Sequence, residues 1–235
     1  MTQKKISLFV PCFVDQIWPS AGIATMRVLE RLGYSVEYPE GQSCCAQPAY
    51  NAGYVNAARR VMEYTASIFA QSPAPVVMPS ASCVGFMRTY YPREGCKAPA
   101  VYELVEFLMR FEKESIARIG ASFPYVVTYH DSCSALREIK LREGVRYILS
   151  QVRGLQLREM QDTDRCCGFG GTFAVKFPSI STAMARYKLQ KALDTSATHV
   201  VSTDVSCLMH LRAYAQAHHL PLRFLHIAEV LNSYE

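Results

Sequence analysis

Short apolar runs rich in β-branched residues alternate along this chain with longer stretches in which apolar side chains recur every three or four positions. The short runs are typical of buried strands, and the longer periodic stretches are typical of helices that bury one face. The predicted strands are Ile6–Val10, Ser35–Tyr38, Val76–Met78, Tyr125–Tyr129, Leu155–Glu159 and His199–Ser202, with a further short run at Leu222–Phe224. The predicted helices are Ala21–Leu32, Asn51–Ala70, Glu103–Arg118, Ala135–Val152 and Ser181–Leu193.

This order of strands and helices occurs twice along the chain. Strand–helix–strand alternation predicts parallel sheets with helices packed on their faces. We therefore predict an α/β fold of two pseudo-repeated lobes, each a small parallel sheet with flanking helices. The predicted domains are residues 1–119 and 120–235, and the break falls near Gly120, after a charged helical stretch.

Composition narrows the class of protein further. Hydrophobic residues make up 50% of the chain and charged residues 19%, which is globular composition. The net charge of +5 comes with no long basic run, so nothing favours nucleic-acid binding. No apolar stretch reaches the ~18 residues of a membrane span.

The N-terminal run Ile6–Val14 follows Lys4 and Lys5 but contains Pro11 and is followed at once by Asp15. This pattern favours a buried strand over a signal peptide, and we expect a cytoplasmic protein. In that compartment cysteines are metal ligands or redox groups rather than a disulfide framework.

The chain has nine cysteines, and eight of them form two matching sets. The first set is Cys12, Cys44, Cys45 and Cys83; the second is Cys133, Cys166, Cys167 and Cys207. Corresponding cysteines lie 121, 122, 122 and 124 positions apart, which indicates an internal duplication. The ninth, Cys96, lies outside the repeat in a polar segment, and we expect it to be a free surface thiol.

In each set, every single cysteine or adjacent pair follows a predicted strand. Ligands of open α/β sheets bind at the carboxyl ends of the strands, so each half is expected to bring four thiols to one edge of its own sheet. Gly168, Gly170 and Gly171 follow the second Cys-Cys pair, and their backbone N–H groups could bond to sulfide or thiolate.

Thiolates select zinc, copper(I) or iron–sulfur clusters. Structural zinc usually uses C-x₂₋₄-C knuckles, and this chain has adjacent Cys-Cys pairs instead. Adjacent cysteines reach two irons of one cluster more easily than two corners of one tetrahedron, which favours a cluster over zinc. Thiol–disulfide chemistry at the adjacent pairs is a third alternative.

The cysteine repeat resembles the cysteine-rich CCG domain, which occurs in tandem in the B component of heterodisulfide reductase, in the iron–sulfur component of glycolate oxidase and in a component of anaerobic glycerol-3-phosphate dehydrogenase. At this length it is similar to the lactate utilization protein A family. The stretches that carry the resemblance span the chain: Cys44–Tyr54, His130–Cys133, Cys166–Phe173, Asp204–Leu208 and His226–Leu231.

The resemblance implies one or two [4Fe-4S] clusters bound by the eight repeated cysteines, with occupancy expected first at the second set and zinc as the alternative at the first. It implies a subunit of an iron–sulfur oxidoreductase complex of the L-lactate dehydrogenase type. That complex would oxidise L-lactate to pyruvate, with lactate utilization proteins B and C as partners. The sequence leaves two places for L-lactate as a substrate: a cluster of this chain with an open iron, or a partner protein. A zinc-binding assembly subunit and a thiol/disulfide redox protein remain alternatives.

The chain departs from the five-cysteine relatives at three positions. Their motif closes with C-x-x-C, but Phe86 and His210 stand at the position of the last thiol. Ala46 replaces the motif's glycine in the first half, whereas the second half keeps Gly168. Four-thiol sites can hold a cubane, hold a cluster with one open iron, or bind a cluster less tightly.

A few further polar residues have weaker claims to a role. His130 and Asp131 precede Cys133 and can form hydrogen bonds near a cluster, although Asp131 or Ser132 is expected to cap the next helix. His210 could ligate a metal but is expected to be solvated or bonded to backbone. Three cationic residues could attract a carboxylate or simply form a charged helix face: Lys176, Arg186 and Lys188.

Overall fold

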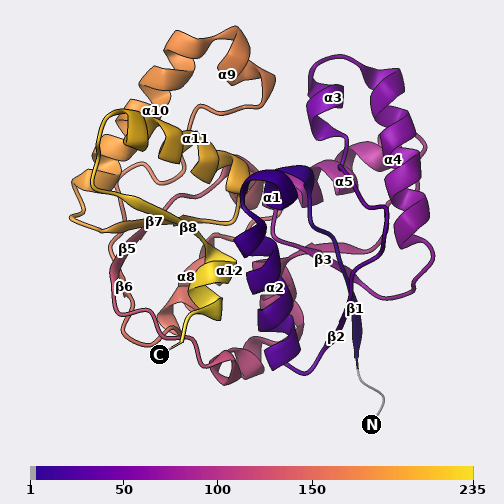
Figure 1. Ribbon diagram of the computed structural model, residues 1–235, viewed down its shortest axis with the longest axis horizontal. Coiled ribbons are helices and arrows are strands. Elements are labelled where there is room, and N and C mark those ends of the chain that lie inside the picture. The colour runs from indigo at the N-terminus through magenta and orange to yellow at the C-terminus, as the bar shows by residue number, and fades with distance from the viewer. Residues whose placement is uncertain (1–3, 235) are drawn as a thin grey trace.

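The computed structural model describes residues 4–234, and it contains two separate four-stranded sheets in which every strand pair is parallel (Figure 1). The first sheet has the order β2-β1-β3-β4, and the second has the equivalent order β6-β5-β7-β8. The strands are β1 (Lys5–Leu8), β2 (Ser35–Glu37), β3 (Val76–Met78), β4 (Val101–Glu103), β5 (Val126–Tyr129), β6 (Gln156–Leu157), β7 (His199–Ser202) and β8 (Arg223–His226). The predicted α/β fold with two pseudo-repeated lobes is confirmed.

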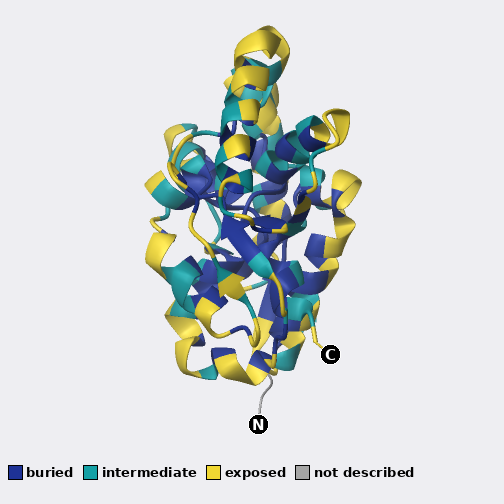
Figure 2. Cartoon of the chain, turned by 90° about the vertical axis from the view of Figure 1, so that its left-hand side faces the viewer, coloured by how far each residue is buried: buried dark blue, intermediate teal, exposed yellow. Residues whose placement is uncertain are grey.

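Helices connect the strands as parallel crossovers require and cover the sheets. Figure 2 shows buried strands in the interior and helices whose outer faces are exposed. The helices are α1 (Cys12–Ile17), α2 (Pro19–Arg31), α3 (Gln47–Asn51), α4 (Val55–Phe69), α5 (Ala81–Arg93), α6 (Leu104–Phe111), the 3₁₀ helix η1 (Lys113–Ile119), α7 (Cys133–Arg137), α8 (Arg142–Ser150), α9 (Thr172–Lys176), α10 (Pro178–Leu193), α11 (Val205–Ala217) and α12 (Ile227–Asn232). Among residues 4–234, no helix is both long and apolar enough to cross a bilayer.

Three predicted helices are wrong in their extent. The stretch 51–70 is divided at Gly53, which has a φ of 92°. The stretch 135–152 is divided near Lys140, which has a φ of 55°. The stretch 103–118 begins at the end of strand β4, which was not predicted, and then divides into α6 and η1. Left-handed residues end an α-helix, and they account for the first two breaks.

The two lobes pack against each other in a reciprocal way. Helix α12 of the second lobe packs on α2, and α6 of the first lobe packs on α8. One hydrophobic core cluster continues through both lobes and includes Val28, Leu104, Tyr129 and Ile227. An isolated antiparallel bridge joins the residues that precede α5 and α11, Ser80 and Asp204. The carboxyl ends of the two sheets are therefore held against each other.

Candidate metal centre

The first set of cysteines converges from three segments of the first lobe. Cys12 begins α1, Cys44 and Cys45 follow β2, and Cys83 lies in the first turn of α5. The sulfurs of Cys12 and Cys44 are 3.6 Å apart, and the backbone N–H of Ala46 donates to the Cys44 sulfur at 3.3 Å. Carboxyl ends of parallel strands meet at one edge of a sheet, which explains the convergence.

The second set occupies the equivalent positions of the second lobe: Cys133 begins α7, Cys166 and Cys167 precede α9, and Cys207 lies in the first turn of α11. Its adjacent pair receives more backbone hydrogen bonds. The N–H of Gly168 donates to the Cys166 sulfur at 3.4 Å, and the N–H of Phe169 donates to the Cys167 sulfur at 3.5 Å. These bonds stabilise thiolates, the form in which cysteine binds metals.

Each set already contains one favoured thiolate. A hydrogen bond from the Cys12 thiol lowers the pKa of Cys44 to about 3 and raises the pKa of Cys12. The same relation between Cys133 and Cys166 raises the pKa of Cys133 and lowers that of Cys166 to about 2. A thiol that donates to a neighbouring sulfur keeps its proton, and the accepting sulfur is then favoured as the thiolate.

A single cavity of about 190 Å³ lies between the lobes and is lined by both sets. Seven of the eight repeated cysteines line it, all except Cys44. Asp204 is the one other ionisable side chain among the described lining residues. The two thiol sets predicted at separate sheet edges thus share one cavity. All nine cysteines are free thiols, and the donor set suits a soft metal or an iron–sulfur cluster.

The residue after each Cys-Cys pair has a left-handed backbone. Gly168 has a φ of 97°, and Ala46 has a φ of 76° at the equivalent position. This conformation turns the N–H of each residue back to a cysteine sulfur two positions earlier. A Cβ on Gly168 would lie 2.6 Å from the carbonyl oxygen of Ser181, so alanine fits the first half better than the second.

His130 follows β5 and is fully buried beside the second set. A ring nitrogen lies within 4.8 Å of the sulfurs of Cys167 and Cys207. Burial, aided by the charge of Lys188, lowers the pKa of His130 to about 3, so the imidazole is neutral at pH 7. The Thr163 backbone lies beside the ring, but neither ring nitrogen has a hydrogen-bond partner among the described residues.

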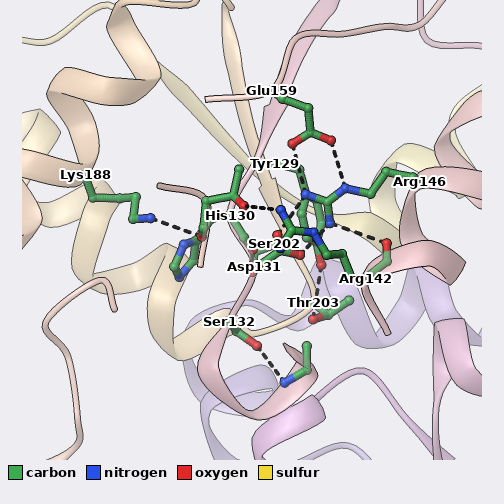
Figure 3. Close-up of polar contacts among 12 residues, drawn as sticks. Tyr129, His130, Asp131, Ser132, Arg142, Arg146, Glu159, Lys188, Ser202 and Thr203 are labelled. Atoms are coloured by element: carbon green, nitrogen blue, oxygen red, sulfur yellow. Dashed lines mark hydrogen bonds and ion pairs between the residues drawn. The ribbon is translucent and has the colours of Figure 1, made fainter. Parts of the chain in front are cut away.

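The two residues that follow His130 are held by an ion pair and by a helix cap. Arg146 forms a bidentate ion pair with Asp131 at 2.5 and 2.8 Å and a second pair with Glu159. Ser132 is the N-cap of α7, one of the two capping residues expected from the sequence. Figure 3 shows the His130 ring turned away from these ion pairs, toward the side on which Lys188 lies.

Several expected candidates lie away from the cavity. Phe86 is buried and stacks with Tyr90, so it fills hydrophobic core at the position where the five-cysteine motif has its last thiol. The Nε2 atom of His210 lies 3.3 Å from the Ser181 hydroxyl oxygen, and His210 does not line the cavity. Cys96 is free but only 7% exposed, so the expectation of a surface thiol is wrong. The chain turns inward after α5 and buries Cys96 in the first lobe's core.

The cationic residues of α9 and α10 are not in the cavity either. Lys188 is 1% exposed and donates to the backbone carbonyl oxygens of Asp162 and Thr163. Lys176 and Arg186 are exposed on the outside of the second lobe. The hypothesis that these side chains attract a carboxylate into the site therefore has no support from their positions.

Comparison with known proteins agrees with the repeat and with the site. The family model of the cysteine-rich domain CCG matches residues 6–88 and 127–212, one match for each half. The chain belongs to the CCG cysteine-rich domain family. Each match in this family contains one complete set of four cysteines.

The matching relatives include lactate utilization protein A from Bacillus thuringiensis (strain Al Hakam) and from Bacillus cereus (strain AH187). Each is 38% identical over 97% of this chain and 99% of its own length. Among solved structures, glutamate racemase from Francisella tularensis has a TM-score of 0.40 and 9% identity, over 99% of this chain and 79% of that chain. That structural likeness is too weak to bear on function.

Proposed function

We propose that this chain is the iron–sulfur electron-transfer subunit of a system that oxidises L-lactate to pyruvate. The observation that carries the proposal is the single cavity lined by two sets of free thiols. The similarity to lactate utilization protein A supplies the lactate context and the expectation of protein partners, the B and C components.

The second set is proposed to hold a [4Fe-4S] cluster, and the first set a further cluster or zinc. Cys133, Cys166, Cys167 and Cys207 would be the ligands of the second site. Backbone N–H groups of Gly168 and Phe169 already point at two of these sulfurs, and such hydrogen bonds tune cluster potentials. Gly170 and Gly171 line the cavity and leave room for the group.

The number of electrons released by lactate oxidation favours a chain with two metal centres. Oxidation of lactate to pyruvate releases two electrons and two protons, and a bound iron–sulfur cluster supplies a one-electron carrier. Thiol sets that share one cavity would place two such carriers close together. One subunit could then accept both electrons of a single turnover.

The cavity walls favour electron transfer over lactate binding. No lysine or arginine is among the described residues that line the cavity, and Asp204 adds a carboxyl group. A lactate carboxylate would therefore find no cationic side chain there. We propose that lactate is oxidised on a partner protein and that this chain receives the electrons.

The test combines the anaerobically purified chain with its candidate partners B and C and L-lactate. We expect lactate to reduce the centres of this chain, seen by electron paramagnetic resonance, only when the partners are present. A Cys96→Ser chain is the matched control and should behave like the wild type. Centres that lactate never reduces would overturn the proposal.

Metal analysis of the same sample distinguishes the proposed function from its two alternatives. Zinc without sulfide would make the chain a zinc-binding assembly subunit. A metal-free chain with reversible disulfides would make it a thiol/disulfide redox protein.

A further inference from the structure

His130 is an unexplained polar group in the interior of the second lobe. It is 0% exposed, and among the described residues its ring has only the Thr163 backbone as a loosely placed partner and no well-aligned hydrogen bond at either nitrogen. Burial of a polar group without a well-formed hydrogen bond destabilises the fold. A missing ligand is a common reason for such a group in a native protein.

The ring is placed to meet a metal. A nitrogen of His130 and the sulfurs of Cys167 and Cys207 all lie within 4.8 Å of one another. Donors bound to one ion at about 2.0–2.3 Å lie up to about 4.6 Å apart, so small side-chain movements suffice. The Thr163 backbone lies on the same ring and could accept the N–H of the second nitrogen, as carbonyls do for metal-bound histidines.

The first lobe shows that the fold does not require a histidine here. Phe9 occupies the equivalent position, directly after β1 and three residues before Cys12. Its N–H donates to the Val77 carbonyl at 2.9 Å, just as the His130 N–H donates to the Val201 carbonyl at 2.9 Å. Phe9 packs on apolar neighbours, so the imidazole is a difference in chemistry on the same backbone.

We propose that His130 is a protein ligand of the metal centre at the second cysteine set, through a ring nitrogen beside Cys167 and Cys207. The inference rests on the proposed function, since it needs a metal at that set. The second centre would then have mixed cysteine and histidine ligation, whereas the first would have thiolates alone. Imidazole is neutral, so an iron that it ligates in place of one of the four thiolates carries less negative charge, which raises the reduction potential of the centre.

The test is pulsed electron paramagnetic resonance on the full chain, reconstituted anaerobically with iron and sulfide. Histidines are labelled with ¹⁵N and all other residues keep ¹⁴N. We expect a strong ¹⁵N coupling to the centre in the wild type and its loss in His130→Phe, which copies the first lobe. His210→Gln is the matched control and should keep the coupling.

The outcomes separate this inference from the proposed function. A reconstituted iron centre with no strong ¹⁵N coupling in the wild type, or with the coupling retained in His130→Phe, would overturn the inference alone. The labelled wild type decides even if His130→Phe fails to fold. A chain that takes up only zinc would refute the proposed function, and zinc X-ray absorption would still show either nitrogen with sulfur or sulfur alone.

Discussion

The two halves of this molecule share one backbone plan but differ in what surrounds their thiols. Around the first set, Ala46 gives one N–H to a sulfur, and Phe9 and Phe86 are apolar. Around the second set, two N–H groups reach the adjacent pair, and His130 stands where Phe9 stands in the first lobe. Duplication thus preserved the strand ends and cysteine positions while the surroundings diverged.

This difference shows that two features can vary independently: the frame, meaning the positions of the four cysteines, and the tuning, meaning the adjustment of a bound centre's potential by the residues around it. The frame depends on parallel strands ending at one edge, a property of the fold. The tuning depends on single residues that donate hydrogen bonds or offer a lone pair. We expect the second centre to be bound more tightly and to have the higher potential.

The largest expected effect comes from removing one ligand from each half in turn. Cys167→Ser should abolish the second centre and Cys45→Ser the first, because each change removes a buried thiolate donor from its set and a serine hydroxyl is a poor substitute for it. Iron and sulfide per chain should fall by about half in each case if both centres are [4Fe-4S]. Cys96→Ser is the control, and an unchanged iron content in Cys167→Ser would show that the ligand assignment is wrong.

The glycine that follows the second pair should be costly to replace. Gly168→Ala should lower the free energy of unfolding by about 2–3 kcal/mol, measured by denaturant titration. The left-handed backbone costs a Cβ-bearing residue about 1–2 kcal/mol, and the new Cβ would lie 2.6 Å from the Ser181 carbonyl oxygen. A decrease in the free energy of unfolding of less than about 0.5 kcal/mol would contradict the left-handed backbone of Gly168 and its closeness to Ser181.

The two buried helix caps should give opposite pH dependences. Burial raises the pKa of Glu103, the N-cap of α6, well above its usual 4.5. The free energy of unfolding should therefore be highest below pH 4.5 and fall as the pH rises through the folded pKa. Glu103→Gln should remove this loss, which is up to about 1.4 kcal/mol per pH unit.

Burial acts in the other direction on the equivalent cap of the second lobe. It lowers the pKa of His226, the N-cap of α12, from 6.5 to about 4. Stability should fall as the pH drops from 6.5 to about 4, because only the unfolded chain takes up the proton there. His226→Asn should flatten the acid side of the stability–pH curve and leave the alkaline side unchanged, and the reverse result would refute the assignment.

The smallest effect is expected at the counterpart of Gly168 in the first half. Ala46→Gly should raise the free energy of unfolding by about 0.5–1 kcal/mol, because glycine adopts the φ of 76° without the penalty that a Cβ brings. Thermal unfolding of Ala46→Gly beside Gly168→Ala provides the measurement. A destabilised Ala46→Gly would mean that the packing of the buried Ala46 methyl group matters more than its backbone strain.

Much of the fold could be predicted from the sequence because the signals are local. Runs such as Val76–Met78 alternate with periodic helical stretches, and the cysteine repeat marks corresponding strand ends. The short strand β4 was missed because Val101–Glu103 runs directly into a helix that its own glutamate caps. Helix breaks at Gly53 and Lys140 depend on single φ angles, which hydrophobic periodicity does not encode.

The site was predictable as far as the convergence of thiols within each half. The shared cavity was not, because it depends on how α5 packs on α7 and α1 on α11, contacts between residues far apart in the sequence. The burial of Cys96 has the same cause, since tertiary packing overrides the polar character of its neighbours. His130 could have been suspected by aligning the halves, which places it opposite Phe9.

The central claim is that two thiol sets on one cavity hold iron–sulfur centres. The most direct test measures iron, acid-labile sulfide and zinc per chain in protein purified without oxygen, with an electron paramagnetic resonance spectrum of the same sample. We expect iron and sulfide in equal amounts, about eight of each for two [4Fe-4S] centres or about four if only the second set is filled. Zinc without sulfide, or no metal after anaerobic reconstitution, would contradict it.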